Sequence, residues 1–269
     1  MNPSLGHLIF SLRFDPVVWL VWLLGVAAYV VPYLRARRDP ARLALWPTWR
    51  VVCFAAGAVI ALLALQSSAV SYTLNSMALY MGRLMVLAEL VPPLIVLGLP
   101  KGLLRLPERG PGRVLLNFLL DPFVALALWA AIIIYWNLPA SFSASVVSAT
   151  TGTLLPFLYL FGGLLVWALL IPPLPGRLGP LGRGGLAVLA TIPMMIVGAV
   201  WISSPHVLYA PYVGVPCLWD STPLGNQRVS GWIMMLADLP ALALALGQVL
   251  GGLILLADSG TVQTPTEKR

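Results

Sequence analysis

The chain has 269 residues, of which 59% are apolar and only 9% are charged, and its mean hydropathy is +0.92. A soluble domain carries about 25% charged residues. So few charges cannot cover a water-facing surface of this size, so most of the surface is expected to face lipid. The pI near 9.9 does not indicate a nucleic-acid-binding protein, because the charges lie in short loops between apolar runs.

The apolar runs have the length of membrane-spanning helices. Crossing about 30 Å of hydrocarbon takes about 20 residues of helix, and an open strand edge cannot be satisfied in lipid. We therefore predict an all-α polytopic membrane protein with one transmembrane domain over 1–258 and a short polar cytoplasmic tail over 259–269. Seven spans are expected, near 17–34, 51–69, 76–98, 114–135, 153–171, 185–203 and 229–256.

The basic residues give the expected orientation of these spans. Of the 16 Lys and Arg residues, 13 lie in the alternate loops 35–50, 99–113 and 172–184 and in the tail. Arg13 and Arg228 are on the opposite side, and Arg83 is inside a span. The positive-inside rule then places the N-terminus outside and the C-terminus in the cytoplasm, as in a multi-pass protein of a bacterial-type plasma membrane.

Four ionisable residues are expected within the bilayer, where each costs roughly 2.5–3.5 kcal/mol on insertion scales. Arg83 on the third span and Asp238 on the seventh are plausible ion-pair partners if the two spans touch. Glu89 and Asp121 are expected at similar depth on the third and fourth spans, where they could share a proton. Two interpretations stay open: polar contacts that fix helix packing, or a proton or ion path.

The third span also carries Met77, Met81 and Met85 at intervals of four residues, followed by Glu89, so that they form one stripe. Thioether sulfur is a soft ligand suited to Cu(I), but methionine is also an adaptable packing residue. The longest outer loop, 204–228, contains His206 and Cys217, which are weak candidates for a copper contact. We find no nucleophile–base pair and no phosphate-binding loop, so we expect no enzymatic activity.

Several segments together resemble a known family, the CtaG-type cytochrome c oxidase assembly proteins. The matching segments, in order, are FDPVVWLVWLLGVAAYV at 14–30, WPTWR at 46–50, YMGRLMVLAELVPPLIVLGLP at 80–100, WNLP at 136–139, GGLLVWALLIPP at 162–173, LYAPY at 208–212 and NQRVSGWIMM at 226–235. The resemblance implies a seven-helix membrane protein that acts in the biogenesis of a haem-copper oxidase.

The chain departs from the family at its histidines, which are the family's candidate copper ligands. By resemblance these histidines would fall at Tyr80, Leu84, Asn137, Gly152 and Pro156. Neither a tyrosine hydroxyl nor a leucine can replace a neutral imidazole as a copper ligand. The family's metal role therefore does not carry over directly, and no cofactor is firmly expected, with copper on the methionines left open.

Three functions follow as hypotheses. The first is an assembly factor for cytochrome c oxidase, acting through copper handling or through stabilisation of a subunit. The second is a histidine-free accessory subunit that stays bound in an oxidase or another respiratory complex. The third is a proton-coupled transporter that uses Arg83, Glu89, Asp121 and Asp238. In the first two, the expected partners are the bilayer and respiratory-complex subunits.

Overall fold

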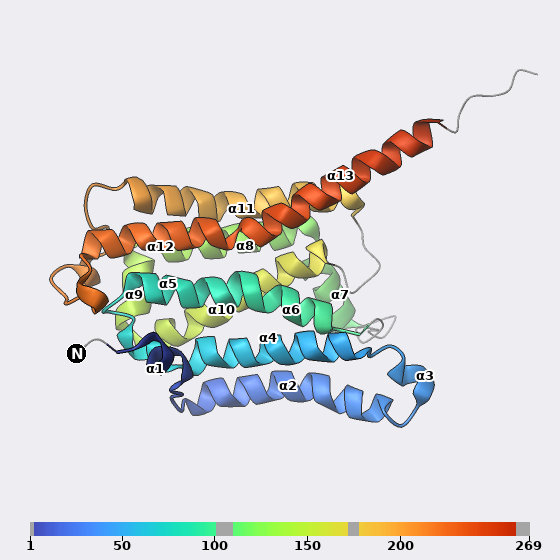
Figure 1. Cartoon of the computed structure of the whole chain (residues 1–269), viewed down its shortest axis with the longest axis horizontal. Helices are drawn as coiled ribbons and strands as arrows, with labels where there is room; N and C mark the ends of the chain where they lie inside the picture. The colour runs from blue at the N-terminus through green and yellow to red at the C-terminus, as the bar shows by residue number, and fades with distance from the viewer. Residues whose placement is uncertain (1–2, 101–109, 172–177, 262–269) are drawn as a thin grey trace, which may run out of the picture.

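The computed structural model describes residues 3–100, 110–171 and 178–261, with side chains described as far as residue 257. Within these ranges the chain is helical, apart from its loops and an isolated antiparallel bridge between Leu12 and Ser67. The long helices lie side by side and alternate in direction (Figure 1). The prediction of an all-α polytopic membrane protein is therefore confirmed.

The long helices are α2 (Pro16–Ala36), α4 (Thr48–Gln66), α8 (Pro122–Asn137), α10 (Ala149–Leu170), α11 (Pro180–Ser203), α12 (Pro223–Ala237) and α13 (Leu239–Thr261). A further rod consists of α5 (Met77–Met85), the π-helix η2 (Val86–Leu90) and α6 (Val91–Gly98). Short helices occur at the ends of the bundle: α1 (Leu5–Phe10), α3 (Pro40–Leu43), η1 (Ser68–Tyr72), α7 (Pro111–Leu119), α9 (Pro139–Val147), η3 (Ala210–Tyr212) and η4 (Leu218–Asp220).

Six segments of the described chain are long and apolar enough to cross a membrane, and a bent pair of helices would make the seventh. This pair, α7 and α8, bends by 68° and replaces the straight span expected over 114–135. The bend has a local cause. Leu120 ends α7, and Asp121 caps α8, whose first residue Pro122 cannot continue a preceding helix.

The rod of α5, η2 and α6 contains one turn of π-helix directly before two consecutive prolines. Pro92 and Pro93 lack amide hydrogens, and in a regular helix each ring would clash with a carbonyl four residues earlier. The wider turn over Val86–Leu90 relieves these clashes, and the backbone N–H of Val91 bonds to the carbonyl of Val86. The same turn carries Glu89 to the interior of the bundle, where its side chain is buried.

Glycines allow the helices to approach closely. A Cβ atom at Gly163 of α10 would collide with the carbonyl of Ala88 and lie 2.8 Å from Pro92 Cγ. A Cβ atom at Gly198 of α11 would lie 2.9 Å from the carbonyl oxygen of Gly231 on α12. Contacts between small residues bring helix backbones together in membranes, where no hydrophobic effect drives helices to associate.

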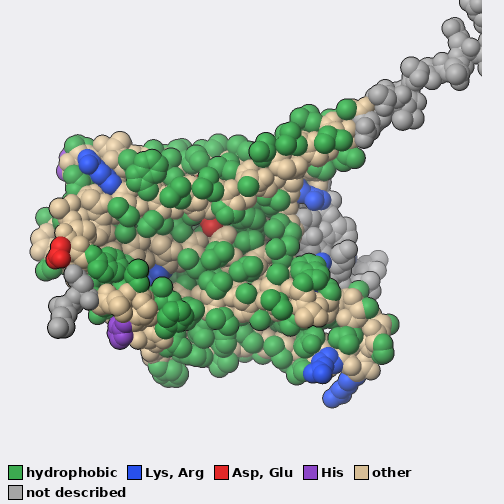
Figure 2. All heavy atoms as spheres, viewed as in Figure 1, with side chains coloured by type: hydrophobic (Ala, Val, Ile, Leu, Met, Phe, Trp, Pro, Cys, Tyr) green, Lys and Arg blue, Asp and Glu red, His purple; other side chains and the backbone are tan. Residues whose placement is uncertain are grey.

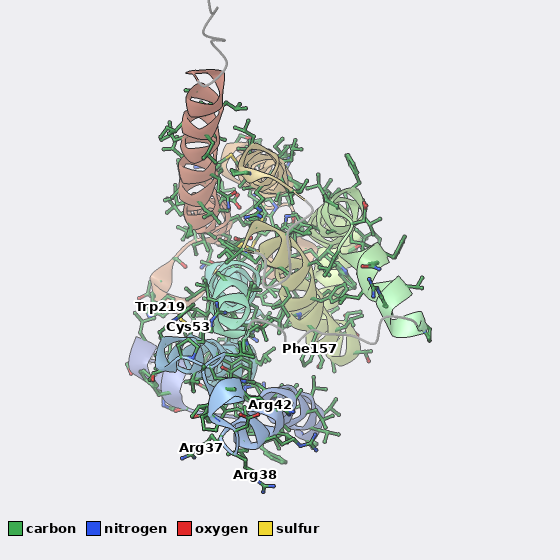
Figure 3. All side chains as sticks on the ribbon, turned by 90° about the vertical axis from the view of Figure 1, so that its right-hand side faces the viewer. Arg37, Arg38, Arg42, Cys53, Phe157 and Trp219 are labelled. Carbon is green, nitrogen blue, oxygen red and sulfur yellow. The ribbon has the colours of Figure 1, made fainter. Side chains whose placement is uncertain are left out.

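The surface has two different ends and an apolar middle. Green apolar side chains cover most of the face in Figure 2, and basic side chains gather beside α3 at its lower right. Arg37, Arg38 and Arg42 point away from the bundle at that end (Figure 3). Both histidines lie at the opposite end, where the N-terminus, α9 and the loop between α11 and α12 also lie (Figures 1 and 2).

This separation agrees with the predicted orientation, in which the α3 end is cytoplasmic and the other end is the outer end. The sides of the membrane themselves stay a prediction from the positive-inside rule. Six of the basic residues behind that prediction lie outside the described residues: Lys101, Arg105, Arg109, Arg177, Lys268 and Arg269. Helix α13 continues to Thr261, and the rest of the expected tail over 259–269 is also outside them.

Candidate functional site

An aromatic cluster fills the outer half of the bundle. Phe142 of α9 lies at its centre, with ring centroids 5.6 Å from Tyr80, 5.5 Å from Trp201 and 4.4 Å from Tyr209. Tyr212 lies farther away, at 6.4 Å. These rings come from α5, α9, α11 and η3, so the cluster ties the outer loop to three helices. All five side chains are buried.

Hydrogen bonds fix the polar ends of these rings. The Tyr80 hydroxyl bonds to Ser145 Oγ over 3.1 Å, and the Tyr209 hydroxyl donates to the carbonyl of Asn137 over 2.7 Å. The side-chain amide of Asn137 donates to the Tyr159 hydroxyl over 2.9 Å. Buried polar groups are costly unless they are paired, so this network favours one arrangement of the helices that carry it, α5, α8, α9 and α10.

The positions that correspond by resemblance to the family's histidines lie around this cluster. Tyr80, Gly152 and Pro156 line one cavity, while Leu84 and Asn137 are buried. The structure thus brings three of the five positions to one site, with Asn137 joined to α10 through Tyr159. None of the five positions carries an imidazole: Tyr80 and Asn137 are hydrogen-bonded and Leu84 is buried, while the other two positions line the cavity.

The cavity has a volume of about 510 Å³ and lies at the outer end of α4, α5 and α10. Its polar lining includes Arg13, Gln66, Tyr80 and Arg83. Its apolar lining includes Phe157, which packs against a core cluster that contains residues of α2 and α4 and lies between α10 and these helices in Figure 3. Sequence reasoning missed this cavity, because its walls come from three stretches that are distant along the chain, 13–18, 65–83 and 145–157.

Arg83 lies in the wall of this cavity and does not pair with Asp238. The Arg83 Nε atom donates to the carbonyl of Ala64 over 2.9 Å, and the side chain is only 8% exposed. No carboxylate of the described residues lies within ion-pair distance of it. The predicted ion pair between the third and seventh spans is therefore wrong, because Arg83 faces the end of α4 rather than α12.

Asp238 is instead the acidic residue whose charge acts on Glu89, and the Trp167 indole donates to Glu89 Oε2 over 3.1 Å. Asp238 is 1% exposed at the junction of α12 and α13, and its Oδ2 atom has no hydrogen-bond partner in the described structure. Sequence spacing gave no signal for this electrostatic interaction, which depends on how α12 packs against α5.

Asp121 has a structural role that the sequence analysis did not assign to it. Its Oδ1 atom accepts hydrogen bonds from the backbone N–H groups of Phe123 and Val124, at 3.0 and 3.3 Å, and caps α8. The sequence left open that Asp121 could share a proton with Glu89, but the acidic residue whose charge acts on Glu89 is Asp238. The four ionisable residues thus lie in three settings: a cavity wall, a buried region with two acidic residues, and a helix cap. They do not form one continuous path.

The methionine stripe lies inside the main apolar core. Met77, Met81 and Met85 are at most 3% exposed and belong to the same core cluster as Met194 and Met234. This cluster also contains many aliphatic and aromatic side chains, so the sulfur atoms take part in tight packing. Such packing accounts for the stripe without a metal, although thioethers remain chemically able to bind Cu(I).

His206 and Cys217 lie in the outer loop without a shared contact. The His206 side chain is exposed, and Cys217 Sγ bonds to the carbonyl of Val215 over 3.8 Å. Burial raises the pKa of the Cys217 thiol, and a hydrogen bond with Ser221 partly offsets this rise. No group of three His, Cys, Asp or Glu side chains suited to a metal occurs among the described residues.

Two amides connect the outer loop to the helices. Asn226 Oδ1 accepts the backbone N–H of Ala78 over 2.7 Å, and Gln227 Oε1 accepts that of Leu208 over 2.8 Å. Both amides are buried at the start of α12. The resemblance at 226–235 was the sequence signal for them, but it did not indicate their structural role.

The fold and this site define a class: an all-α multi-pass membrane protein whose outer half encloses a polar cavity next to an aromatic cluster. Residues 27–254 match the family described as cytochrome c oxidase caa3 assembly factors (Caa3_CtaG), so the chain belongs to that family. The family resemblance predicted from the sequence is thereby confirmed. Comparison with curated proteins and with solved structures gives no match.

Proposed function

We propose that this assembly factor acts by holding a membrane subunit of the oxidase rather than by passing copper along imidazole ligands. The observation that carries the proposal is the replacement of all five histidine positions. At these positions Tyr80 is hydrogen-bonded to Ser145, and Asn137 donates a hydrogen bond to Tyr159. Leu84 is fully buried. Such side chains stabilise a bundle, but they offer no soft or imidazole donor to a copper ion.

The exposed surface of the helices supports a role in holding a partner. Large apolar side chains point outward from α8, α11 and α13, among them Phe123, Ile196 and Leu246. Such side chains can contact lipid or the helices of another membrane protein equally well. A subunit of the oxidase would therefore bind within the plane of the membrane, which for this family we take to be the bacterial plasma membrane. No catalytic step is part of this role.

The proposal is tested by isolating the protein from cells that express the oxidase and titrating it with Cu(I) under reducing conditions. We expect co-purification with oxidase subunits in a fixed ratio and no stoichiometric Cu(I). Copper bound at one equivalent, and lost in the Met81→Leu and Met85→Leu variants, would overturn the proposal in favour of copper delivery. The Met235→Leu variant is the matched control, because Met235 is a partly buried methionine at the contact between α11 and α12.

The duration of the contact distinguishes an assembly factor from a permanent subunit. An assembly factor is released when the oxidase matures, so it should co-purify with immature oxidase and be absent from the active enzyme. A constant ratio to the fully active oxidase would instead support the accessory-subunit hypothesis. Quantitative mass spectrometry of both oxidase fractions measures this ratio directly.

A further inference from the structure

The Arg83 guanidinium is buried without an acidic partner in the described structure. More than nine-tenths of the Arg83 side chain is buried, and the side chain lines the cavity. Within the described structure, its guanidinium donates one hydrogen bond, from Nε to the carbonyl of Ala64. A guanidinium has five N–H donors in a planar fork that matches a phosphate or carboxylate. The donors that Ala64 leaves free therefore suit an anion inside the cavity.

A second arginine strengthens this positive character. Arg13 also lines the cavity, and its charge lies close enough to Arg83 to interact with it. Two like charges at one site repel each other, so an anion between them relieves an unfavourable interaction. The repulsion is a cost that the protein carries when the cavity contains only water.

Neutral donors complete the polar wall. Tyr80, Ser145 and Thr153 supply hydroxyl groups. The first turn of α10 begins beside them at Ser148, whose side chain does not cap the helix, and the N-terminal end of a helix favours a negative charge. The Thr153 hydroxyl and the first backbone N–H groups of α10 can donate hydrogen bonds to an oxyanion, whereas Tyr80 already bonds to Ser145 and Ser145 donates to the carbonyl of Phe142.

The acidic member of the lining is already engaged. Asp15 Oδ1 accepts the backbone N–H groups of Val17 and Val18, at 3.0 and 3.3 Å, and caps α2. The backbone N–H of Asp15 donates to Gln66 Oε1 over 3.1 Å. Asp15 therefore stabilises the start of α2 and is not within ion-pair distance of Arg83.

The rest of the wall is apolar. Phe14, Val18, Leu65, Val147 and Phe157 contribute to it, and the exposed side chains of Phe14 and Val147 show that it opens to the surface of the molecule. Arg83 is six residues into the rod that begins at Met77, which places it about 9 Å along the helix axis. Since the whole span crosses about 30 Å of hydrocarbon, this depth lies in the outer half of the apolar layer.

We propose that this cavity binds the phosphate group of a membrane phospholipid, with Arg83 and Arg13 on the phosphate and the acyl chains along the apolar wall. The two arginines account for the charge of the ligand, and the apolar wall accounts for its amphiphilic nature. This site is separate from the proposed contact with an oxidase subunit, and either proposal can fail without the other.

The test uses the purified full chain in a neutral detergent, with phosphatidylglycerol and diacylglycerol that carry the same acyl chains. We expect phosphatidylglycerol to remain bound in native mass spectrometry and to raise the unfolding temperature by several degrees, and diacylglycerol to do neither. Equal effects of the two lipids would overturn the proposal. Inorganic phosphate that reproduces the stabilisation while the phospholipid does not would assign the site to a soluble phosphate instead.

Variants locate the site. Arg13→Gln changes an exposed side chain and is expected to fold normally while it weakens phosphatidylglycerol binding about tenfold. Arg83→Lys, which keeps the charge and loses the planar fork, should weaken binding as well. Arg228→Gln removes an exposed arginine of the same membrane side that does not line the cavity, and should leave binding unchanged. Equal behaviour of the Arg13 and Arg228 variants would exclude this cavity as the site.

Discussion

At the scale of single residues, Gly163 shows how closely two helices of this bundle pack. Its hydrogen atom occupies space in which a methyl group would collide with the carbonyl of Ala88, one turn before Pro92. The carbonyl belongs to the backbone of the π-turn and cannot rotate away as a side chain does. Gly163 therefore determines how near α10 lies to the rod of α5, η2 and α6.

We predict that Gly163→Ala destabilises the protein by about 1–3 kcal/mol, the usual range for overpacking. A thermal unfolding series in detergent measures the effect. Gly82→Ala is the matched control, because a Cβ atom there meets nothing within 4 Å and alanine favours a helix by about 1 kcal/mol over glycine. A Gly163→Ala protein as stable as the Gly82→Ala protein would contradict the close approach of the helices.

Cys217 provides a prediction of pH dependence. Burial raises the pKa of its thiol, so the reactive thiolate forms only at higher pH than in an ordinary cysteine, whose pKa is about 8.5. We expect the alkylation rate of Cys217 in a Cys53→Ser background to rise through a midpoint above that value. The reference protein carries Val213→Cys together with Cys217→Ser, so that an exposed thiol lies in the same loop. A midpoint at or below that of the reference thiol would refute the prediction.

The identity of the ionisable residues within the spans could be read from the sequence, but their partners could not. Arg83, Glu89 and Asp238 were recognised because charges stand out in apolar runs. Which charges meet depends on the rotation and crossing of helices that are more than a hundred residues apart, and single-sequence spacing holds no such information. In the structure the charge of Asp238 acts on Glu89, and Arg83 lies in a cavity wall.

At the scale of elements, the bend between α7 and α8 depends on one capping side chain. The Asp121 carboxylate satisfies two backbone N–H groups at the start of α8, which would otherwise lack partners within the helix. The bend and the cap occur together, because the chain leaves helical geometry at the residue that caps the next helix.

We predict that Asp121→Ala lowers the stability by about 1 kcal/mol, as the loss of an N-cap usually does. The amides of Phe123 and Val124 should then exchange their hydrogens faster, which hydrogen-exchange mass spectrometry detects. Asp121→Asn keeps an oxygen acceptor at the cap and should behave like the parent protein. A loss of stability in the asparagine variant as large as that in the alanine variant would show that charge, rather than capping, is the function of Asp121.

The positions of most spans followed from the sequence, whereas their irregularities did not. Apolar length alone located α2, α4, α10 and α11 to within a few residues. Length cannot distinguish a straight span from two helices at an angle, so the segment 114–135 was read as one rod. The two prolines at 92 and 93 are visible in the sequence, but the π-turn before them also packs against α10, which the sequence does not show.

At the scale of the whole molecule, we expect the asymmetry of charge to determine which end faces the cytoplasm. Arg37, Arg38 and Arg42 project from the α3 end, and the outer loop with its buried tyrosines lies at the other end. Arginines near the ends of spans are retained on the cytoplasmic side during insertion. The predicted orientation of the bundle thus depends on a few exposed residues and not on its core.

We predict opposite accessibility for cysteines at the two ends in a background without Cys53 and Cys217. In intact cells, a membrane-impermeant maleimide should label a Val213→Cys protein. It should label an Arg38→Cys protein only after the membrane is permeabilised. Both positions are exposed, so accessibility reports the side of the membrane. Labelling of both from the same side would refute the threading of the chain on which the fold interpretation rests.

The helices α12 and α13 together are longer than a bilayer needs. They form a candidate span over Pro223–Ala257, and the part that follows the outer loop, 229–257, is about 44 Å of helix, whereas the hydrocarbon layer is about 30 Å thick. Figure 1 shows α13 extending beyond its neighbours, and Leu250, Leu253 and Ile254 on it are more than half exposed. Hydrophobic mismatch of this size is relieved by tilting the helix or by thickening the surrounding lipid. Membrane thickness should therefore influence how the C-terminal end of this protein meets its neighbours.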